Sequence, residues 1–305
     1  MPKDHFVRTG LDWGSLAPLH LKARSIASGL YAGMHRSQRR GSGVEFGGHR
    51  TYVPGDDLRF LDHRAAMRHD KLLIREFETD TDRALRLVLD ASPSMGFRSE
   101  SARASKLAYA SVIAAALGRV ALAGGDAVAL DWLFGAGTEP MRARSGMLTF
   151  EHLVHELERA NVGEGRGLTL EQFRRSLEPV GLRSRRGSII VVFSDLLDLP
   201  ENAAEHLAQL GTGGRFVVVV QVLDPVEAEF KLDGAVRLKS PETGLVVETN
   251  AEEVRAAYLR ALEQLSANFK QQLLRRSGQL LRAVTTEEPL AVARRILSTI
   301  SGAPR

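Results

Sequence analysis

The chain has 305 residues and no cysteine; 44% of its residues are hydrophobic, 26% are charged, and the formal net charge is +4. These values are ordinary for a soluble globular protein, and they exclude disulfides, thiolate metal sites and cysteine nucleophiles. No apolar run reaches the roughly 20 residues of a membrane helix, and the first ten residues lack a signal-peptide core. We therefore expect a cytoplasmic protein with no membrane segment.

Strands and helices alternate along the chain from residue 84 onward, according to the period of their apolar residues. The predicted strands are residues 83–89, 127–135, 138–144 (a short edge strand), 188–195 and 215–224. The predicted helices are residues 101–123, 150–160, 170–177 and 201–210. After Asp224 the pattern changes to a small antiparallel meander with turns at Asp233-Gly234 and near Gly244. A long helix from 251 to about 276, a strand at 280–284 and a closing helix from Pro289 complete the chain.

The strands are continuous runs of Val, Ile and Leu rather than alternating polar and apolar residues. Such strands are buried on both faces, which indicates a mostly parallel sheet with helices on both sides. We assign this α/β domain to residues 84–225. Residues 1–83 are expected to pack on the main domain as an irregular N-terminal segment. Residues 226–305 are expected to add the meander, the long helix and the closing strand and helix.

Oxygen-bearing side chains follow three segments at the predicted carboxyl edge of the sheet. They are Asp90, Ser92 and Ser94 after the first strand, Thr169 at the start of a helix, and Asp195 with Asp198 after a later strand. Each one alone is an ordinary helix cap or turn residue. Together they form a set of hard oxygen ligands at the edge where parallel α/β sheets bind ligands. Such a set suits Mg²⁺, with Mn²⁺ or Ca²⁺ as the alternatives.

The Asp-x-Ser-x-Ser stretch, a later Thr and an Asp after a buried strand resemble the metal-ion-dependent adhesion site of von Willebrand factor A domains. This resemblance implies that Ser92, Ser94 and Thr169 coordinate the ion directly. It also implies that Asp90 and Asp195 act directly or through water. One position of the ion then remains open for a carboxylate from another protein.

The segment "GSGVEFGGHRTYVPGDDLRFLDHRAAMRHDKLLIREFETD" at 41–80 resembles the bacterial domain-of-unknown-function 58 family. The shared features are Gly-x-Glu-Phe and Arg-x-Tyr-x-Pro-Gly-Asp-Asp-x-Arg, and the resemblance covers about residues 30–300. It departs at His63, where the family usually has Trp. The resemblance implies a partner, a MoxR-type AAA+ ATPase, with this chain as its adaptor or co-chaperone and with a client protein as a further source of an acidic ligand.

We predict a binding module that is not an enzyme. The chain has neither a Gly-x-Ser-x-Gly elbow around Ser94 nor a Gly-x-x-x-x-Gly-Lys-Ser/Thr phosphate loop. A Mg²⁺-dependent phosphoesterase or nuclease that uses Asp90 and Asp195 stays open as an alternative. Nucleic-acid binding by the N-terminal segment is a weaker one, because the first 79 residues hold only 13 Lys and Arg against 9 Asp and Glu. Asp198, Asp57 and Arg59 are candidate partner contacts; for the last two, a structural ion-pair network is the favoured interpretation.

Overall fold

The computed structural model describes residues 11–34, 45–51, 73–78, 84–163 and 169–302. The chain divides into two compact units, a larger one over Met1–Met34 and Arg83–Arg305 and a smaller one over His35–Asp82. In the smaller unit, β1 (Glu45–Thr51) and β2 (Leu73–Glu78) pair as an antiparallel hairpin. The candidate contacts Asp57 and Arg59, like His63, lie outside the described residues.

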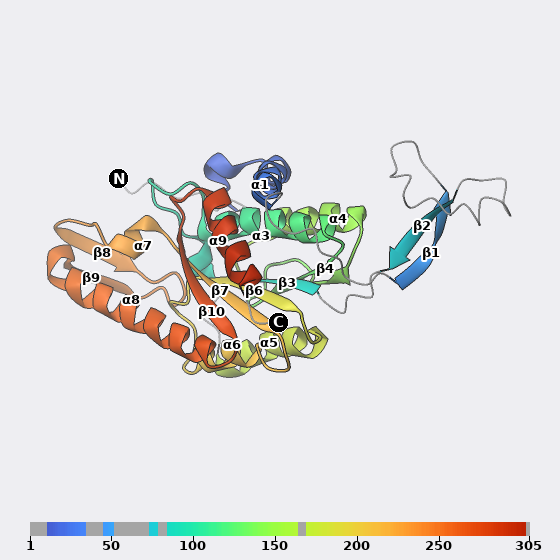
Figure 1. Cartoon of the computed structure of the whole chain (residues 1–305). Helices are drawn as coiled ribbons and strands as arrows, with labels where there is room; N and C mark the ends of the chain where they lie inside the picture. The colour runs from blue at the N-terminus through green and yellow to red at the C-terminus, as the bar shows by residue number, and fades with distance from the viewer. Residues whose placement is uncertain (1–10, 35–44, 52–72, 79–83, 164–168, 303–305) are drawn as a thin grey trace. The chain divides into compact units, whose positions relative to one another are not determined.

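The larger unit is built on a six-stranded sheet (Figure 1). In the order in which they pair, its strands are β10 (Gly278–Val284), β7 (Phe216–Leu223), β6 (Ile189–Ser194), β3 (Ala84–Leu89), β4 (Ala127–Trp132) and β5 (Met141–Arg144). Neighbouring strands run parallel, except for the antiparallel pair of β4 and the edge strand β5. If the six strands are numbered 1 to 6 along the chain, starting with β3, their order from the β5 edge is 3-2-1-4-5-6. This is the doubly wound order, in which the direction of strand addition reverses at β3. Ligands of such sheets bind beyond the carboxyl ends of the strands at this reversal.

Helices cover both faces of this sheet (Figure 1). One face carries α1 (Leu19–Met34), α3 (Lys106–Ala123), α4 (Met147–Arg159) and α9 (Pro289–Ser301). The other face carries α5 (Leu170–Arg183), α6 (Ala203–Gln209) and α8 (Ala251–Leu274). Successive residues of a strand point to opposite faces, so Leu87 enters the core on the first face and Val88 the core on the second. Short helices at Gly14–Leu16 (η1), Pro93–Gly96 (η3) and Pro225–Glu229 (α7) lie between these elements.

A second antiparallel hairpin follows α7 and pairs apart from the main sheet. It consists of β8 (Ala235–Lys239) and β9 (Val246–Asn250). Gly234 and Gly244 have φ angles of +68° and +71°, a region that favours glycine, at the two turns expected from the sequence. The predicted meander is therefore a single hairpin that leads directly into α8.

One helix of the described residues, α3, is by length and composition apolar enough to cross a membrane. This was not expected from the apolar runs of the sequence. In the structure 78% of the helix is buried, packed against α1, α4, α9 and the sheet. Burial on this scale is what a central core helix requires, because it has neighbours on nearly all sides.

The predicted order of strands and helices from residue 84 onward is confirmed, and most boundaries shift by a few residues. The helix expected from residue 101 begins at Lys106, because the side chain of Ser105 caps it by accepting a hydrogen bond from the Ala108 amide. The expected division at residue 225 is not found. The strand assigned to a C-terminal addition is β10, which pairs along its whole length with β7 and completes the sheet. The expected segment 1–83 is also divided, since α1 packs on α3 within the larger unit.

Candidate metal-binding site

The first part of the site is the turn that follows β3. Asp90 comes directly after the strand and is 1% exposed. One of its carboxylate oxygens accepts a hydrogen bond from the amide of Ser92 at 2.9 Å, and the other accepts one from the hydroxyl of Ser194 at 2.6 Å. Ser194 is the last residue of β6, so the two central strands fix the direction of the Asp90 carboxylate together.

The two serines of this turn lie side by side. Ser92 precedes Pro93, which starts the one-turn helix η3, and Ser94 belongs to that helix. Their Oγ atoms are 3.1 Å apart, and Ser94 is 4% exposed. Two neighbouring ligands of an octahedral Mg²⁺ with bonds of 2.0–2.1 Å are about 3 Å apart. The two hydroxyls thus have the spacing of adjacent ligands of one small cation.

The second part of the site follows β6. Asp195 is 2% exposed, and one of its oxygens accepts a hydrogen bond from the Leu197 amide at 3.1 Å. The other oxygen accepts one from Nζ of Lys106 at 2.7 Å. Lys106, at the start of α3, is fully buried and also donates to Glu227 at 2.5 Å. Asp195 therefore already has a cationic partner within the fold.

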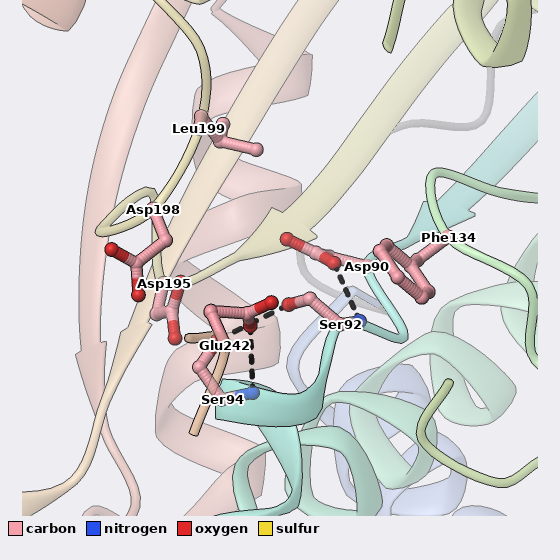
Figure 2. A pocket seen from close by; sticks show the side chains of 8 residues that line it. All are labelled: Asp90, Ser92, Ser94, Phe134, Asp195, Asp198, Leu199 and Glu242. Carbon is pink, nitrogen blue, oxygen red and sulfur yellow. Dashed lines mark hydrogen bonds between the residues drawn. The ribbon is translucent and has the colours of Figure 1, made fainter. Parts of the chain in front are cut away.

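These side chains enclose a small cavity (Figure 2). It is lined by Asp90, Ser92, Ser94, Phe134, Asp195, Asp198, Leu199 and Glu242. Its volume is about 10 Å³, close to the smallest space that holds one water molecule or an ion of similar size. The lining combines four carboxylates and two hydroxyls with two apolar side chains, Phe134 next to Asp90 and Leu199 beyond Asp198 (Figure 2).

The cavity carries more negative charge than its surroundings neutralise. Burial, followed by the nearby Asp195 charge, raises the pKa of Asp90 to about 6, although hydrogen bonds from Ser194 and Ser92 lower it. Burial also raises the pKa of Asp198 and Glu242. Lys106 is the cation that faces this group: burial lowers its pKa, but Asp195 and Glu227 outweigh burial and raise it. A further cation in the cavity would stabilise the ionised carboxylates.

Thr169, which the sequence predicts as the third hydroxyl ligand, is not among the residues that line the cavity. It is exposed and caps α5: its Oγ1 accepts a hydrogen bond from the Gln172 amide at 3.2 Å, and the Gln172 side chain accepts one from the Thr169 amide at 2.9 Å. The chain does pass beside the cavity at Gly163, whose amide donates to Ala91 at 2.6 Å. A Cβ at Gly163 would lie 2.2 Å from the Phe134 ring, so this close approach needs glycine.

Sequence reasoning did not include two charged residues that the structure brings to the site. Glu242, 3% exposed, reaches the cavity from the turn between β8 and β9, and its Oε1 accepts a hydrogen bond from the Ser94 amide at 3.0 Å. Lys106 sits at the start of an apolar helix. A glutamate in a Pro-Glu-Thr-Gly turn and a lysine in the first turn of a helix are ordinarily exposed, so the sequence has no local signal for either role.

The residues present fit a divalent cation when the hydroxyls are counted. In the described part of the chain, no three His, Cys, Asp or Glu side chains converge as they do in metal sites built from those residues alone. A cation here would therefore depend on Ser92 and Ser94. Asp90 and Asp195 already accept hydrogen bonds at both oxygens, so they fit a role through bound water better than direct contact. The Oε2 atom of Glu242 is buried without a hydrogen-bond partner, and a cation in the cavity would supply the partner that this oxygen lacks.

Three features together define a von Willebrand factor A-like α/β domain. They are the doubly wound sheet, the Asp-x-Ser-x-Ser turn after β3, and Asp195 after β6. The fold expected from the sequence is thereby confirmed. A fold of this kind suggests a module for protein interaction. The family profile described as "Protein of unknown function DUF58" matches residues 48–268, and the chain belongs to this family.

The chain is also similar to several solved structures. An aerotolerance-related membrane protein from Bacteroides fragilis NCTC 9343, with multiple mutations to serines, is 19% identical over 72% of this chain and 98% of its own, with a TM-score of 0.45. The conserved hypothetical protein BatB from Bacteroides thetaiotaomicron is 17% identical over 72% and 100%, with a TM-score of 0.44. The SpRpn10 VWA domain is 11% identical over 73% and 99%, with a TM-score of 0.37.

A search of curated proteins finds no match to the chain. The similar structures are too distant to carry a ligand, a partner or a cellular location over to this protein. The cytoplasmic location expected from composition has no support in these comparisons.

Proposed function

We propose that the protein binds a divalent cation at the carboxyl edge of its sheet and, through that cation, a carboxylate of a partner protein, without catalysis. The observation that carries the proposal is the pair of hydroxyls of Ser92 and Ser94, 3.1 Å apart, in a buried cavity with a surplus of carboxylates. Mg²⁺ is the expected ion, with Mn²⁺ or Ca²⁺ as substitutes, because every polar group that lines the cavity is a hard oxygen ligand.

The roles of the individual residues follow from their hydrogen bonds. Ser92 and Ser94 would contact the ion, and Asp90, which is fixed by Ser194, would hold a bound water and supply charge. Lys106 already neutralises Asp195, so this carboxylate adds little to the neutralisation of a bound divalent ion. When bound, the ion supplies electrostatic attraction for a further hard anion.

Hydrolysis of a phosphate ester is the weaker alternative for this geometry. Among the described residues that line the cavity there is no Arg, Lys or His, whereas phosphoryl transfer needs cationic groups around the transferred phosphate. The carboxylates around the cavity also repel a polyanionic substrate more strongly than they repel a single carboxylate. The same repulsion disfavours nucleic acid at this edge of the sheet.

The partner that we propose is a MoxR-type AAA+ ATPase, with this chain as its adaptor in the assembly or activation of client proteins. Support for this partner comes from the family resemblance described above, and the cavity supports a protein carboxylate as the contacting group. Asp198, at the exposed rim of the cavity, lies where a partner would first approach.

Titration calorimetry with Mn²⁺ and Mg²⁺ tests the metal directly. We expect one divalent ion per wild-type chain and an affinity roughly 10- to 100-fold lower in Ser92→Ala and Ser94→Ala, the usual scale for loss of one contact to a charged group. Ser101→Ala removes an exposed hydroxyl from the nearby loop and serves as the matched control. Equal binding in the Ser92, Ser94 and Ser101 variants would place the ion elsewhere and contradict the proposal.

The partner is tested by measuring association with the MoxR-type ATPase of the same cell in Mg²⁺ and in EDTA. Loss of association in EDTA and in Ser92→Ala, with Ser101→Ala unchanged, is the expected result. Association that is equally tight in EDTA would mean that the ATPase docks on another surface. Turnover of ATP or a phosphoester by the purified protein, lost in Asp195→Ala, would favour the enzyme instead.

A further inference from the structure

The hairpin of β8 and β9 buries a charge and exposes its apolar residues. Among residues 231–250, all of which are described, Glu242 alone is buried, at 3% exposure. Leu245 is 65% exposed and Val247 is 48% exposed. This inverts the usual distribution, in which glutamate is almost never fully buried unless it is paired. The buried carboxylate of Glu242 therefore needs a hydrogen-bonding or cationic partner.

Glu242 points into the candidate metal-binding site (Figure 2). Its Oε1 accepts the hydrogen bond from the Ser94 amide, and its Oε2 is buried with no hydrogen-bond partner. Nearby side chains add repulsion, since Asp195 and Asp198 carry the same charge. A buried carboxylate with one free oxygen, among other carboxylates, stays ionised only beside a cation and otherwise takes up a proton.

We infer that Glu242 is an internal ligand of the divalent cation at Ser92 and Ser94, and that it occupies the position which a partner's carboxylate must take. The inference rests on the proposed function, because it requires the cation. With Glu242 in place the cavity has a volume of about 10 Å³ and no space for a second carboxylate. The free protein is then closed, and a partner binds only by displacing Glu242.

The hairpin is built so that such a displacement is feasible. No side chain of β8 or β9 is buried. Hydrogen bonds attach the base of the hairpin to α8, where the Ala251 amide donates to Gly234 and the Gly234 amide donates to Glu252. An isolated two-stranded hairpin is marginally stable in water, so Glu242 is its main attachment at the tip. Movement about the base would withdraw the carboxylate without disturbing the sheet.

Competition within one chain has a defined consequence for affinity. A ligand tethered by a short segment acts at an effective concentration in the millimolar range. An external carboxylate must exceed this value before it occupies the ion. Removal of the Glu242 carboxylate should therefore open the ion to small carboxylates that wild type excludes.

Water-proton relaxation of the Mn²⁺-loaded protein tests this inference, because relaxivity increases with the number of exchanging waters on the ion. We expect low relaxivity in wild type that does not change with added acetate. In Glu242→Ala we expect relaxivity about one third higher, because an octahedral ion that is held by Ser92, Ser94 and Glu242 has three waters and the loss of Glu242 admits a fourth. Acetate should then reduce the relaxivity of the variant toward the wild-type value.

Two further variants guard against trivial effects. Glu248→Gln removes an exposed carboxylate from the same hairpin and should behave as wild type. Glu242→Gln keeps an acceptor for the Ser94 amide and should fold even where Glu242→Ala does not; its relaxivity should lie above that of wild type. Amide hydrogen exchange of residues 235–250 should be faster in Glu242→Ala, since the tip of the hairpin loses its hydrogen bond to the Ser94 amide, and less affected in Glu242→Gln, which keeps that acceptor.

The outcomes separate this inference from the proposed function. Equal relaxivity in wild type and both Glu242 variants, with Mn²⁺ bound through Ser92, would overturn the inference and leave the metal site intact. Loss of Mn²⁺ from Glu242→Ala that acetate does not restore would show a permanent ligand and overturn displacement. Absence of Mn²⁺ binding from wild type would overturn both.

Discussion

The strand β3 carries buried charge at two places, and the two places differ in how that charge is neutralised. In the middle of the strand, Arg86 donates to Asp131 of β4 at 2.6 Å, and its guanidinium also donates to the Arg183 carbonyl at the end of α5. Both side chains of the ion pair are less than 10% exposed. One cation faces one anion, and no net charge is left over.

At the carboxyl end of the same strand the charges do not balance. Asp90, Asp195 and Glu242 all line one cavity, and within the described residues Lys106 contacts only one of the three, Asp195. In the first arrangement the charges balance within the fold, although the Nε atom of Arg86 is buried without a hydrogen-bond partner, and the pair belongs to the stability of the fold. The second is incomplete and needs a charge from outside, which is the property of a binding site.

The largest effect should come from breaking the balanced pair. Asp131→Ala leaves the buried Arg86 guanidinium without its carboxylate, and we expect the free energy of unfolding to fall by about 3–5 kcal/mol. Urea unfolding measures this loss. Mn²⁺ affinity of the folded variant should stay at the wild-type value, because neither residue lines the cavity.

The double variant Arg86→Met with Asp131→Leu is the control for this comparison. Replacing both members by apolar residues of similar size removes the charge and its partner together, so stability should return to near the wild-type value. A double variant as unstable as Asp131→Ala would show that the pair does more than neutralise itself.

Removal of a charge at the carboxyl end of β3, where the charges do not balance, should have a smaller effect on the free energy of unfolding, and one of opposite sign. The pKa of Asp90 is raised from 3.8 to about 6 in the folded protein. Between these values the folded state holds a proton that the unfolded state has released, so the free energy of unfolding decreases as the pH rises from 4 to 6. The decrease is on the order of 2–3 kcal/mol. Asp90→Asn in EDTA should lack this decrease and be more stable than wild type at pH 7.5.

Addition of Mg²⁺ should make wild type more stable than Asp90→Asn, the reverse of their order in EDTA. Wild type should gain stability as the ion saturates it, by about 2.7 kcal/mol at 100 times the dissociation constant, and Asp90→Asn should gain much less. Thermal unfolding at pH 7.5 with and without Mg²⁺ measures both. A wild type that gains nothing from Mg²⁺ would indicate that the surplus carboxylates are simply protonated.

The smallest effect concerns Thr169, which distinguishes the cap seen in the structure from the ligand expected from the sequence. As a cap, Thr169→Ala should cost about 1 kcal/mol of stability and leave Mn²⁺ affinity unchanged. Chemical unfolding and calorimetry on the same preparation decide between the roles. A drop in Mn²⁺ affinity would support the ligand role that the family resemblance implies.

Most of the fold could be predicted because its signals are local. The Val and Ile runs of β6 and β7 identify strands covered on both faces, and turn residues mark where they end. The serines of the Asp-x-Ser-x-Ser turn could be placed for the same reason, since two strands and one turn determine their position. The sequence locates the sixth strand at residues 280–284 but does not show that it belongs to the main sheet, because its pairing with β7 links segments separated by the hairpin and α8.

The contributions of Glu242 and Lys106 could not be predicted, because each depends on a contact between distant segments. Glu242 lies 148 residues from Ser94 in the sequence, and Lys106 lies 89 residues from Asp195. A turn glutamate and a helix lysine have many exposed positions available. Glu242 is buried because the hairpin folds back onto the sheet domain, and Lys106 is buried because of the orientation of α3. No short sequence pattern predicts either arrangement.

The packing of α1 determines how late in synthesis this helix can gain all its packing partners. This helix near the N-terminus contacts α3 and also α9, where Leu290 lies against Gly29 and Arg294 donates to the Gly29 carbonyl. The part of α1 around Gly29 is therefore translated long before the helix that covers it, because Gly29 and Arg294 are 265 residues apart in the sequence. Until α9 leaves the ribosome, this part of α1 lacks one of its packing partners, and the nascent chain is open to chaperones and to aggregation there.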